Sequence, residues 1–294
     1  MSLPMYYFLA TAAVYILMSW SFYLPYRVGQ LHFMTVANMT ISGYFGAVAA
    51  LYWNWPFALI FIAGIAIGAL IGYITSIAIG DAPCFAVVIV GFTFIYITKT
   101  IVENIEFLGG SYGLFGLPGL NKTVILIIAY GFVVLVGYLI YQFDHSRLGR
   151  AASAIFVDKN LAASFGGNAK KLGMLLQTAA SSIGGASGIL YAFCMRSLSP
   201  EYFTFHLVGA CMTMLFVGGY TTQWGVVLAA PLLYGGPLLF PPEIASWRIV
   251  IYGVILVVVL VLKPEGIITR KMVHSIELKF SRSLGKLKYK GDKS

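Results

Sequence analysis

Nine apolar segments follow one another along this chain of 294 residues and constrain its fold more than any other feature. A helix needs about 20 mostly apolar residues to cross a bilayer, and lipid offers no hydrogen bonds to an irregular backbone. The segments therefore predict an all-α polytopic membrane protein with about nine, or eight to ten, transmembrane helices. They cover residues 5–24, 33–53, 57–79, 84–107, 123–143, 172–195, 205–219, 224–240 and 247–263.

Charge supports this class and predicts an orientation. Only 10% of the residues are charged, against about a quarter in soluble domains. The net charge of +9 does not indicate nucleic-acid binding, because nine of the 19 lysines and arginines lie in 263–294, five in 144–171 and one at Arg27. Basic clusters mark cytoplasmic loops, so we predict that the N-terminus is outside and that the C-terminus is cytoplasmic, next to anionic lipid.

The longest polar interruption before the tail, residues 144–171, faces the cytoplasm in this topology. Its Ala-rich part, 151–165, contains only single charges, which favours a short helix with one smooth face that docks on another protein. We predict that this loop contacts a cytosolic motor protein. On this division a transmembrane domain covers 1–265 and includes the loop, and 266–294 form a basic cytoplasmic tail.

Two segments carry faces of small residues that allow close helix packing. Gly64, Gly68 and Gly72 form a tandem GxxxG pattern in the third segment. We interpret both faces as helix–helix contacts, with a role in permeation as the alternative. The face in the sixth segment consists of Ser181, Ser182, Gly184, Gly185 and Gly188.

Charged residues inside a membrane segment are costly and usually face a bundle interior or a wet cavity. Lys99 and Glu103 in the fourth segment are four residues apart and can pair on one helix face, and Glu106 follows. Two interpretations remain open. The residues form a local ion pair near the outer interface, or Lys99 and Glu103 line a translocation path and sense the charged ends of a substrate.

Two loops are predicted on the outer side. Residues 107–120 contain five glycines and one proline, so they cannot form a regular helix, and they lack the sequence of a phosphate-binding loop. A re-entrant or gate-like loop fits this composition. The aromatic loop 197–205 suits the rim of an opening or a docking surface for an extracytoplasmic protein, and equally the ordinary anchoring of aromatic residues at the interface.

The sequence shows no enzymatic site. Three cysteines lie singly in apolar segments, and the four histidines have no metal-binding spacing. Neither a Ser/His/Asp arrangement nor a nucleotide-binding motif is present. We therefore expect that the chain is not an enzyme and has no metal or cofactor of its own.

An ordered set of short motifs resembles the permease subunits of branched-chain amino acid ABC transporters. Each motif is weak alone, but the order and spacing match over most of the chain. The motifs are Gly29-Gln30-Leu31, Gly109-Gly110-Ser111, Ser146-Arg147-Leu148-Gly149-Arg150-Ala151, Ala162 to Gly166, Ser199-Pro200-Glu201, Gly218-Gly219 with Trp224-Gly225, Trp247-Arg248, Ile251-Tyr252-Gly253 and Lys263-Pro264-Glu265-Gly266.

This resemblance implies a type II ABC importer permease, a helical bundle in the bacterial inner membrane that pairs with a second homologous permease subunit, usually a different chain. Two cytosolic ATPase subunits would bind ATP and magnesium. A periplasmic or extracytoplasmic binding protein would deliver the substrate, a branched-chain amino acid or a related small polar or amphipathic solute. The 144–171 loop would be the coupling helix.

The motifs and the residue patterns together nominate three groups of site residues. They are Arg147, Gly149, Arg150, Ala154, Ala162 and Gly166 for ATPase coupling; Lys99, Glu103, His32 and Ala210 for the translocation path; and Gly109, Gly110, Ser199, Pro200 and Glu201 for the outer mouth and docking of the binding protein.

The chain departs from the family pattern at several of these places. Phe156 and Val157 replace a usually charged run, which predicts a more apolar ATPase groove. His32 stands where a small residue is usual and Ala210 where an acidic residue is common, so leucine-type specificity does not follow from the resemblance. The alternative function is a proton-coupled secondary transporter of a small organic solute, with Glu103 in the relay. A membrane-embedded enzyme is disfavoured because no cluster of His, Asp or Ser is present.

Overall fold

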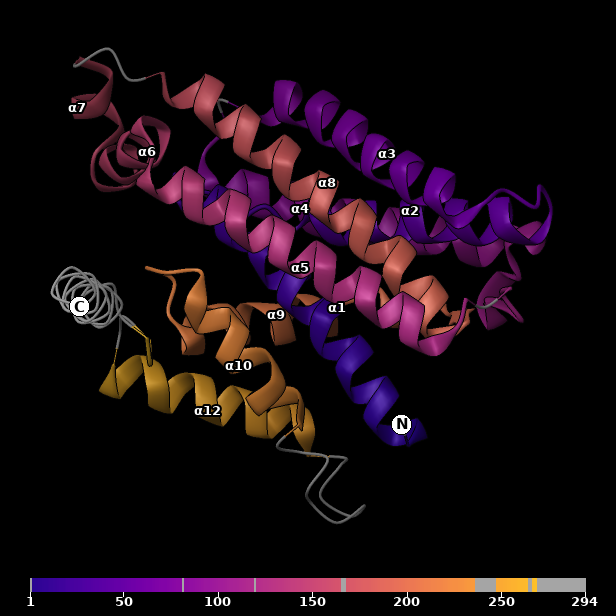
Figure 1. Cartoon of the computed structure of the whole chain (residues 1–294). Helices are drawn as coiled ribbons and strands as arrows, with labels where there is room; N and C mark the ends of the chain where they lie inside the picture. Colours follow the sequence, from indigo (N-terminus) through magenta and orange to yellow (C-terminus); the bar gives the residue numbers. More distant parts are fainter. Residues whose placement is uncertain are drawn as a thin grey trace, which may run out of the picture.

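The computed structural model describes residues 2–80, 82–118, 120–164, 168–235, 247–263 and 266–268, which form a bundle of helices (Figure 1). Each predicted apolar segment coincides with a helix, so the all-α polytopic fold is confirmed. The long helices are α1 (Leu3–Tyr26), α2 (Met34–Leu51), α3 (Phe57–Ile79), α4 (Cys84–Asn104), α5 (Lys122–His145), α8 (Ala169–Met195), α9 (Phe205–Gly218), α10 (Trp224–Gly235) and α12 (Arg248–Leu262).

The number of spanning helices differs from the prediction. Within the described residues, seven helices are long and apolar enough to cross a membrane. The described parts of α10 and α12 have 12 and 15 residues, fewer than the about 20 that a span requires. The predicted count of about nine is therefore not confirmed.

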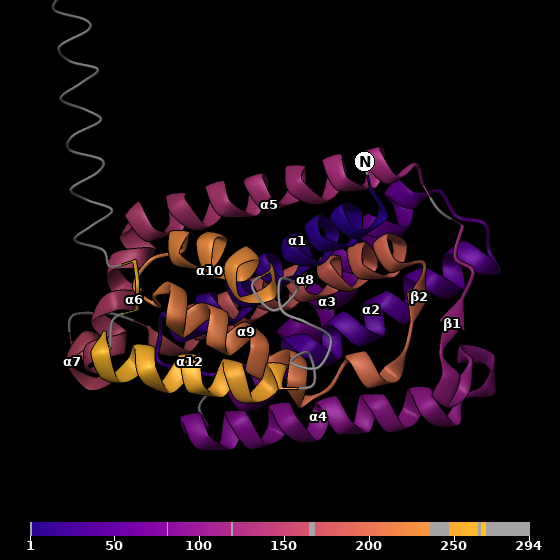
Figure 2. The same ribbon diagram turned by 90° about the horizontal axis from the view of Figure 1, so that it is seen from below.

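Short elements gather at the two ends of the bundle (Figure 2). Helices α6 and α7 follow α5 at one end, which we call the α6 end. The opposite end, called the ribbon end, carries the antiparallel pair β1–β2. The short elements are α6 (Arg147–Val157), α7 (Lys159–Ser164), η1 (Glu106–Leu108), η2 (Gly110–Tyr112), η3 (Pro200–Tyr202), β1 (Leu114–Phe115) and β2 (Ser197–Leu198).

Helix α8 lies at the centre and packs along α1, α2 and α3. The small-residue faces of α3 and α8 meet each other, as the helix-contact interpretation predicted. A side chain on Gly68 would collide with the carbonyl of Ser181. On its contact with α2, a side chain on Gly188 would collide with the carbonyl of Met39. The helix backbones touch at these points, which larger residues would prevent.

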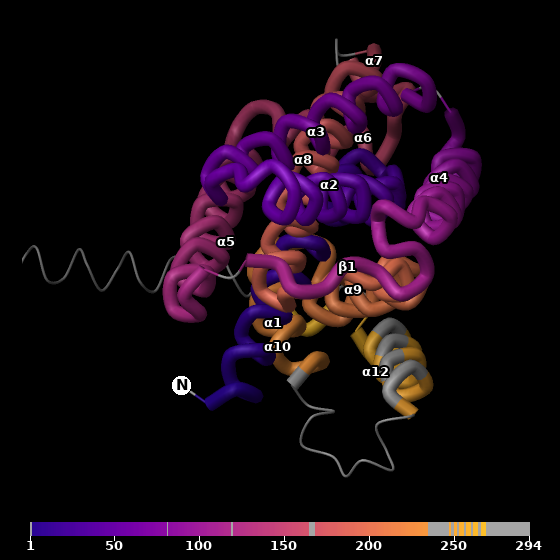
Figure 3. The backbone as a smooth tube through the Cα atoms, turned by 90° about the vertical axis from the view of Figure 1, so that its right-hand side faces the viewer, coloured from indigo at the N-terminus to yellow at the C-terminus, as the bar shows by residue number. Residues whose placement is uncertain are grey.

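The outer helices expose apolar surface. In the end-on view of Figure 3, α4 and α5 lie on opposite sides of the bundle. Large apolar side chains on α3, α4 and α5 point away from the core, among them Ile62, Phe85 and Val134 with exposed fractions of 63%, 75% and 70%. Such a surface is unsuited to water and fits the hydrocarbon layer of a membrane.

The start of α1 and the residues after α12 lie at opposite ends of the bundle. The Tyr6 hydroxyl donates a hydrogen bond of 3.1 Å to the carbonyl of Cys194 at the ribbon end of α8. Beyond α12, the Ile267 N–H donates a hydrogen bond of 2.9 Å to the carbonyl of Val217 near the end of α9. The predicted tail therefore begins at the α6 end, and its remainder, 269–294, lies outside the described residues.

Candidate functional site

The α6 end is built on a sharp corner between α5 and α6. The Ser146 hydroxyl accepts a hydrogen bond of 3.2 Å from the Gly149 N–H and donates one of 2.7 Å to the Phe143 carbonyl, which caps α6. Gly149 packs directly against the carbonyls of Phe143 and Asp144, where a side chain would collide. Gly149 is buried within this chain, so it positions α6.

Helix α6 has one face packed on the bundle and one exposed face. Arg147, Arg150 and Ala154, all nominated from the sequence, lie on the exposed face, because their spacing places them on one side of a helix. Val157 extends this face and is 84% exposed. Val157 departs from the family pattern and is not among the docking residues predicted from the sequence. We call these four residues the exposed α6 face.

The Ala-rich stretch forms two helices where one was predicted. Asp158 separates them, because its side chain accepts hydrogen bonds from the N–H groups of Asn160 and Leu161 at 2.8 and 3.0 Å and caps α7. Ala162 is only 8% exposed and packs within the chain. The nominated coupling residue Gly166 lies outside the described residues.

At the ribbon end, β1 and β2 join the two loops that were predicted separately on the outer side. Leu114 pairs with Leu198, and Phe115 with Ser197. Gly113 permits the approach, since it has a φ of +84° and a side chain there would collide with the Leu198 carbonyl. Sequence patterns did not predict this ribbon, because each strand has only two residues.

Glycines also shape the turn between η1 and η2. Gly109 and Gly110 have φ values of +83° and +56°, a region that favours glycine. The prediction that 107–120 contains no regular α-helix is therefore confirmed. The two nominated glycines determine the path of the chain next to the ribbon.

Lys99 connects the predicted path to the predicted outer mouth. Its Nζ lies 3.5 Å from Glu103 Oε1 and 3.9 Å from Glu201 Oε1, so the expected i, i+4 pair is present. Glu201 follows the nominated Ser199 and Pro200, which lead into η3, and η3 packs next to α4. Residues nominated for two different sites thus form one cluster at the ribbon end.

The other path residues lie deeper. His32, in the irregular segment between α1 and α2, is 1% exposed, and its Nε2 lies 3.4 Å from Ser181 Oγ near the middle of α8. Ala210 is buried in α9. Gly91 of α4 packs against the start of α2, and Lys99 lies eight residues, or about 12 Å, further along α4. The four nominated path residues therefore do not form one cluster in this chain.

A buried amide pair lies next to His32. Gln177 of α8 donates a hydrogen bond of 2.7 Å from Nε2 to Gln30 Oε1, and Gln177 is completely buried. In the sequence, Gln30 stands out only as part of the Gly29-Gln30-Leu31 motif, and no motif includes Gln177. The signal that could have identified this pair is the polar side chain of Gln177 inside an otherwise apolar segment.

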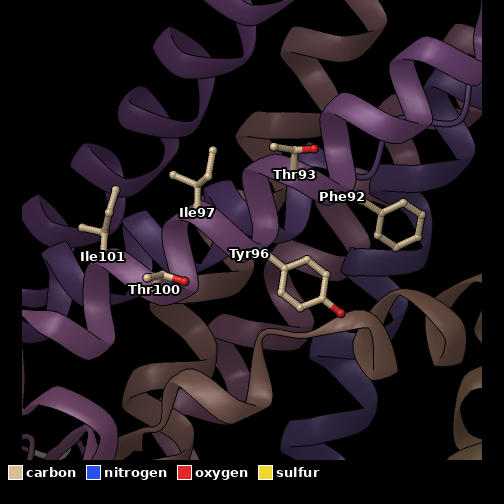
Figure 4. Close-up of a pocket in the computed structure, with 6 residues that line it drawn as sticks. All are labelled: Phe92, Thr93, Tyr96, Ile97, Thr100 and Ile101. Atoms are coloured by element: carbon tan, nitrogen blue, oxygen red, sulfur yellow. The ribbon is translucent and has the colours of Figure 1, made fainter.

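A hollow of about 530 Å³ lies along the exposed side of α4 (Figure 4). Binding sites for small molecules are usually enclosed by several elements, whereas this hollow is lined by one helix. Within this chain it is therefore an outward-facing surface and not an enclosed site. Its lining residues are Phe92, Thr93, Tyr96, Ile97, Thr100 and Ile101.

Neither end of the bundle resembles a metal centre. Among the residues that the structure describes, no group of His, Cys, Asp or Glu side chains could hold a metal ion. Seven described helices that are long and apolar enough to cross a membrane, with large apolar side chains on the outer surface, indicate a multi-pass membrane protein.

Comparison with known families identifies the chain further. The family described as the branched-chain amino acid transport system, permease component, matches residues 5–260. The chain belongs to this family, and the resemblance inferred from its motifs is confirmed. Membership identifies it as a transport permease.

Two relatives are the high-affinity branched-chain amino acid transport system permease proteins LivM of Escherichia coli (strain K12) and Salmonella typhimurium (strain LT2). Each is 26% identical over 151 residues, a match that covers 51% of this chain and 35% of the relative. The matched region is thus about a third of each relative's length. No solved structure matches the chain.

Proposed function

We propose that this chain is the transmembrane permease subunit of an ATP-driven importer in the bacterial inner membrane. The solute is an amino acid, branched-chain or a related small polar or amphipathic compound. Family membership supports transport, and the names of the relatives support the solute class. The observation that carries the ATP-driven part is the exposed α6 face.

The exposed α6 face has the chemistry of a protein contact. Ala154 and Val157 leave room for close approach, while Arg147 and Arg150 offer charge to acidic groups on a partner. The face lies at the end where the basic tail begins, which supports a cytoplasmic location and a nearby anionic lipid surface. On this proposal two ATPase subunits bind ATP and magnesium, and α6 docks in a groove of one of them.

The ribbon end faces the extracytoplasmic side and receives a substrate-binding protein. Glu201 is the exposed member of its charged cluster, with 80% of the side chain accessible. Lys99 and Glu103 offer one positive and one negative group at 21% and 27% exposure. Such a pair matches the carboxylate and ammonium groups of an amino acid that enters the mouth.

A second homologous permease subunit completes the path. The described residues of this chain place Lys99 and Glu103 at one end and His32 deep in the bundle, without a continuous polar cluster. If the translocation path runs between two subunits, each subunit needs to supply the polar side chains of only one wall of the path. A proton-coupled transporter is less well supported, because Glu103 is ion-paired at the ribbon end instead of lying deep in a proton relay.

Co-expression with candidate ATPase, permease and binding-protein partners tests the proposal. We expect two ATPase subunits to co-purify with a permease pair. Proteoliposomes of this complex should take up labelled leucine only when ATP is present on the side of the membrane that carries the ATPase subunits. Uptake driven by a proton gradient without ATP, together with absent ATPase binding, would support the secondary transporter instead.

A further inference from the structure

Arg27, the residue directly after the last turn of α1, contacts both α5 and α6. Its Nε lies 3.2 Å from Asp144 Oδ1 near the end of α5, and its Nη2 donates a hydrogen bond of 2.9 Å to Ser153 Oγ of α6. Tyr23, one turn earlier, donates a hydrogen bond of 2.6 Å to the other carboxylate oxygen of Asp144. Helix α1 therefore holds the end of α5 at two points and α6 at a third.

The residue before Arg27 makes a second connection. The Tyr26 ring meets the ring of Phe156 in α6 with centroids 5.5 Å apart, and the ring of Phe216 near the end of α9 at 5.4 Å. Phe156 and Ser153 are three residues apart, so they lie on one side of α6; Ser153 is half-buried and Phe156 is 42% exposed. Tyr26, the last residue of α1, and Arg27, which follows it, thus connect α6 to both α5 and α9.

We propose that Tyr26 and Arg27 are positioning residues that transmit a displacement of α6 to α1 and α9 during transport. The proposal rests on the proposed function, in which α6 docks on an ATPase. Arg27 and Asp144 have side-chain exposures of only 11% and 13%, and separating a largely buried ion pair is costly. A displacement of the α5–α6 corner therefore carries α1 with it.

Helix α1 is placed to pass the displacement on. It packs along α8, the central helix, and also contacts α2, α5, α9 and α10. A movement of its last turn therefore reaches five other long helices. We call the contacts of Tyr26 and Arg27 with α6 the junction. If the junction only anchored α6, its loss would lower assembly or stability and leave the number of ATP molecules used per imported solute unchanged.

Two variants disconnect α6 from α1 without removing the Arg27–Asp144 pair. Ser153→Ala removes the hydroxyl that accepts from Arg27, and Tyr26→Leu in addition removes the ring contact with Phe156. Ser153→Thr retains a hydroxyl. Ser164→Ala is the matched control, because its hydroxyl bonds to the Leu161 carbonyl within α7.

The measurement is ATP hydrolysed per labelled leucine imported by the reconstituted complex with its ATPases and binding protein. We expect the Ser153→Ala/Tyr26→Leu variant to assemble with normal yield and to raise this ratio about fivefold or more, the range of ordinary coupling between sites. Ser153→Ala alone should raise it less. Ser153→Thr and Ser164→Ala should match the wild type.

An unchanged ratio of ATP hydrolysed to leucine imported in the assembled double variant would overturn the proposal that the junction transmits the displacement. If the double variant does not assemble, Ser153→Ala decides, and a wild-type ratio there overturns the proposal. If the wild-type chain does not bind ATPases, both the proposed function and the proposed role of the junction are contradicted. If the wild type imports normally with ATP and the variants keep the wild-type ratio, only the role of the junction is contradicted.

Discussion

Glu201 in η3 lies 3.9 Å from Lys99 of α4, measured between carboxylate oxygen and ammonium nitrogen. The contact joins a membrane helix to a loop from the other half of the chain. Glu201 is mostly exposed and Lys99 is partly exposed, and pairs of this kind contribute only about 0–1 kcal/mol to stability. The cluster therefore contributes little to the fold, and its charges are available to a solute or to a docking protein.

The first prediction concerns Lys99 and Glu103. Removing both charges with Lys99→Met and Glu103→Gln leaves neither group unpaired, and Glu201 remains solvated. We therefore expect assembly and stability to stay within about 1 kcal/mol of the wild type, while uptake of labelled leucine falls. The measurement is a double-mutant cycle that scores assembly and transport separately.

Glu201→Gln is the control, since it removes one contact to Lys99 and leaves the Lys99–Glu103 pair in place. We expect it to reduce uptake less than the double variant. Normal transport in the double variant, with defects confined to the two single variants, would assign the pair to structure alone.

The sequence predicts the bundle well, because apolar length and small-residue spacing are properties of single segments. The contact between the glycines of α3 and Ser181 follows from such patterns. The Lys99–Glu103 pair does too, since its members share one helix. The family resemblance likewise came from local motifs read in order.

What the sequence does not predict depends on contacts between distant segments. The β1–β2 ribbon joins two loops through strands of two residues each, which are too short to show the alternating pattern of a strand. In the sequence, Arg27 contributes only to the basic pattern that predicts topology, and its bonds to Asp144 and Ser153 depend on how α1, α5 and α6 meet. Ala162 has a small side chain suited to docking, but the packing of α7 buries it.

The second prediction concerns the exposed α6 face. Ala154→Glu should leave insertion intact and reduce the coupling of ATP hydrolysis to uptake, because an unpaired charge buried in a protein contact typically costs several kcal/mol. Ala58→Glu adds the same charge at an exposed position in the first turn of α3, at the ribbon end, and is the control. Substrate-stimulated ATPase activity equal to the wild type in Ala154→Glu would contradict docking through this face.

The third prediction concerns the contact of α8 with α2. Gly188→Ala places a methyl group against the Met39 carbonyl, and overpacking of this kind costs about 1–3 kcal/mol. Gly131→Ala in α5 is the matched control, because a side chain there meets open space. Thermal unfolding in detergent should show a lower midpoint temperature for Gly188→Ala and not for Gly131→Ala. Equal midpoints for Gly188→Ala and the wild type would show that α8 and α2 can move apart without loss of stability.

The last prediction concerns the tail. Ile267 and Ile268 donate hydrogen bonds of 2.9 Å to the carbonyls of Val217 and Gly218, the final carbonyls of α9. Truncation after Arg270 keeps these bonds, and the basic residues that it removes contribute only about 1 kcal/mol each near an anionic membrane. We expect this variant to assemble and transport as the wild type does.

Truncation after Lys263 is the informative comparison, because it removes both hydrogen bonds to α9. Each typically contributes about 0.5–1.5 kcal/mol, and the exposed carbonyls would have to find other partners. Gly266, which has a φ of +85° and packs against Gly219, is lost as well. We expect a lower yield of assembled complex and a lower unfolding midpoint for this variant. Equal loss of assembly in both truncations would instead show that the basic tail beyond Arg270 is needed to build the complex.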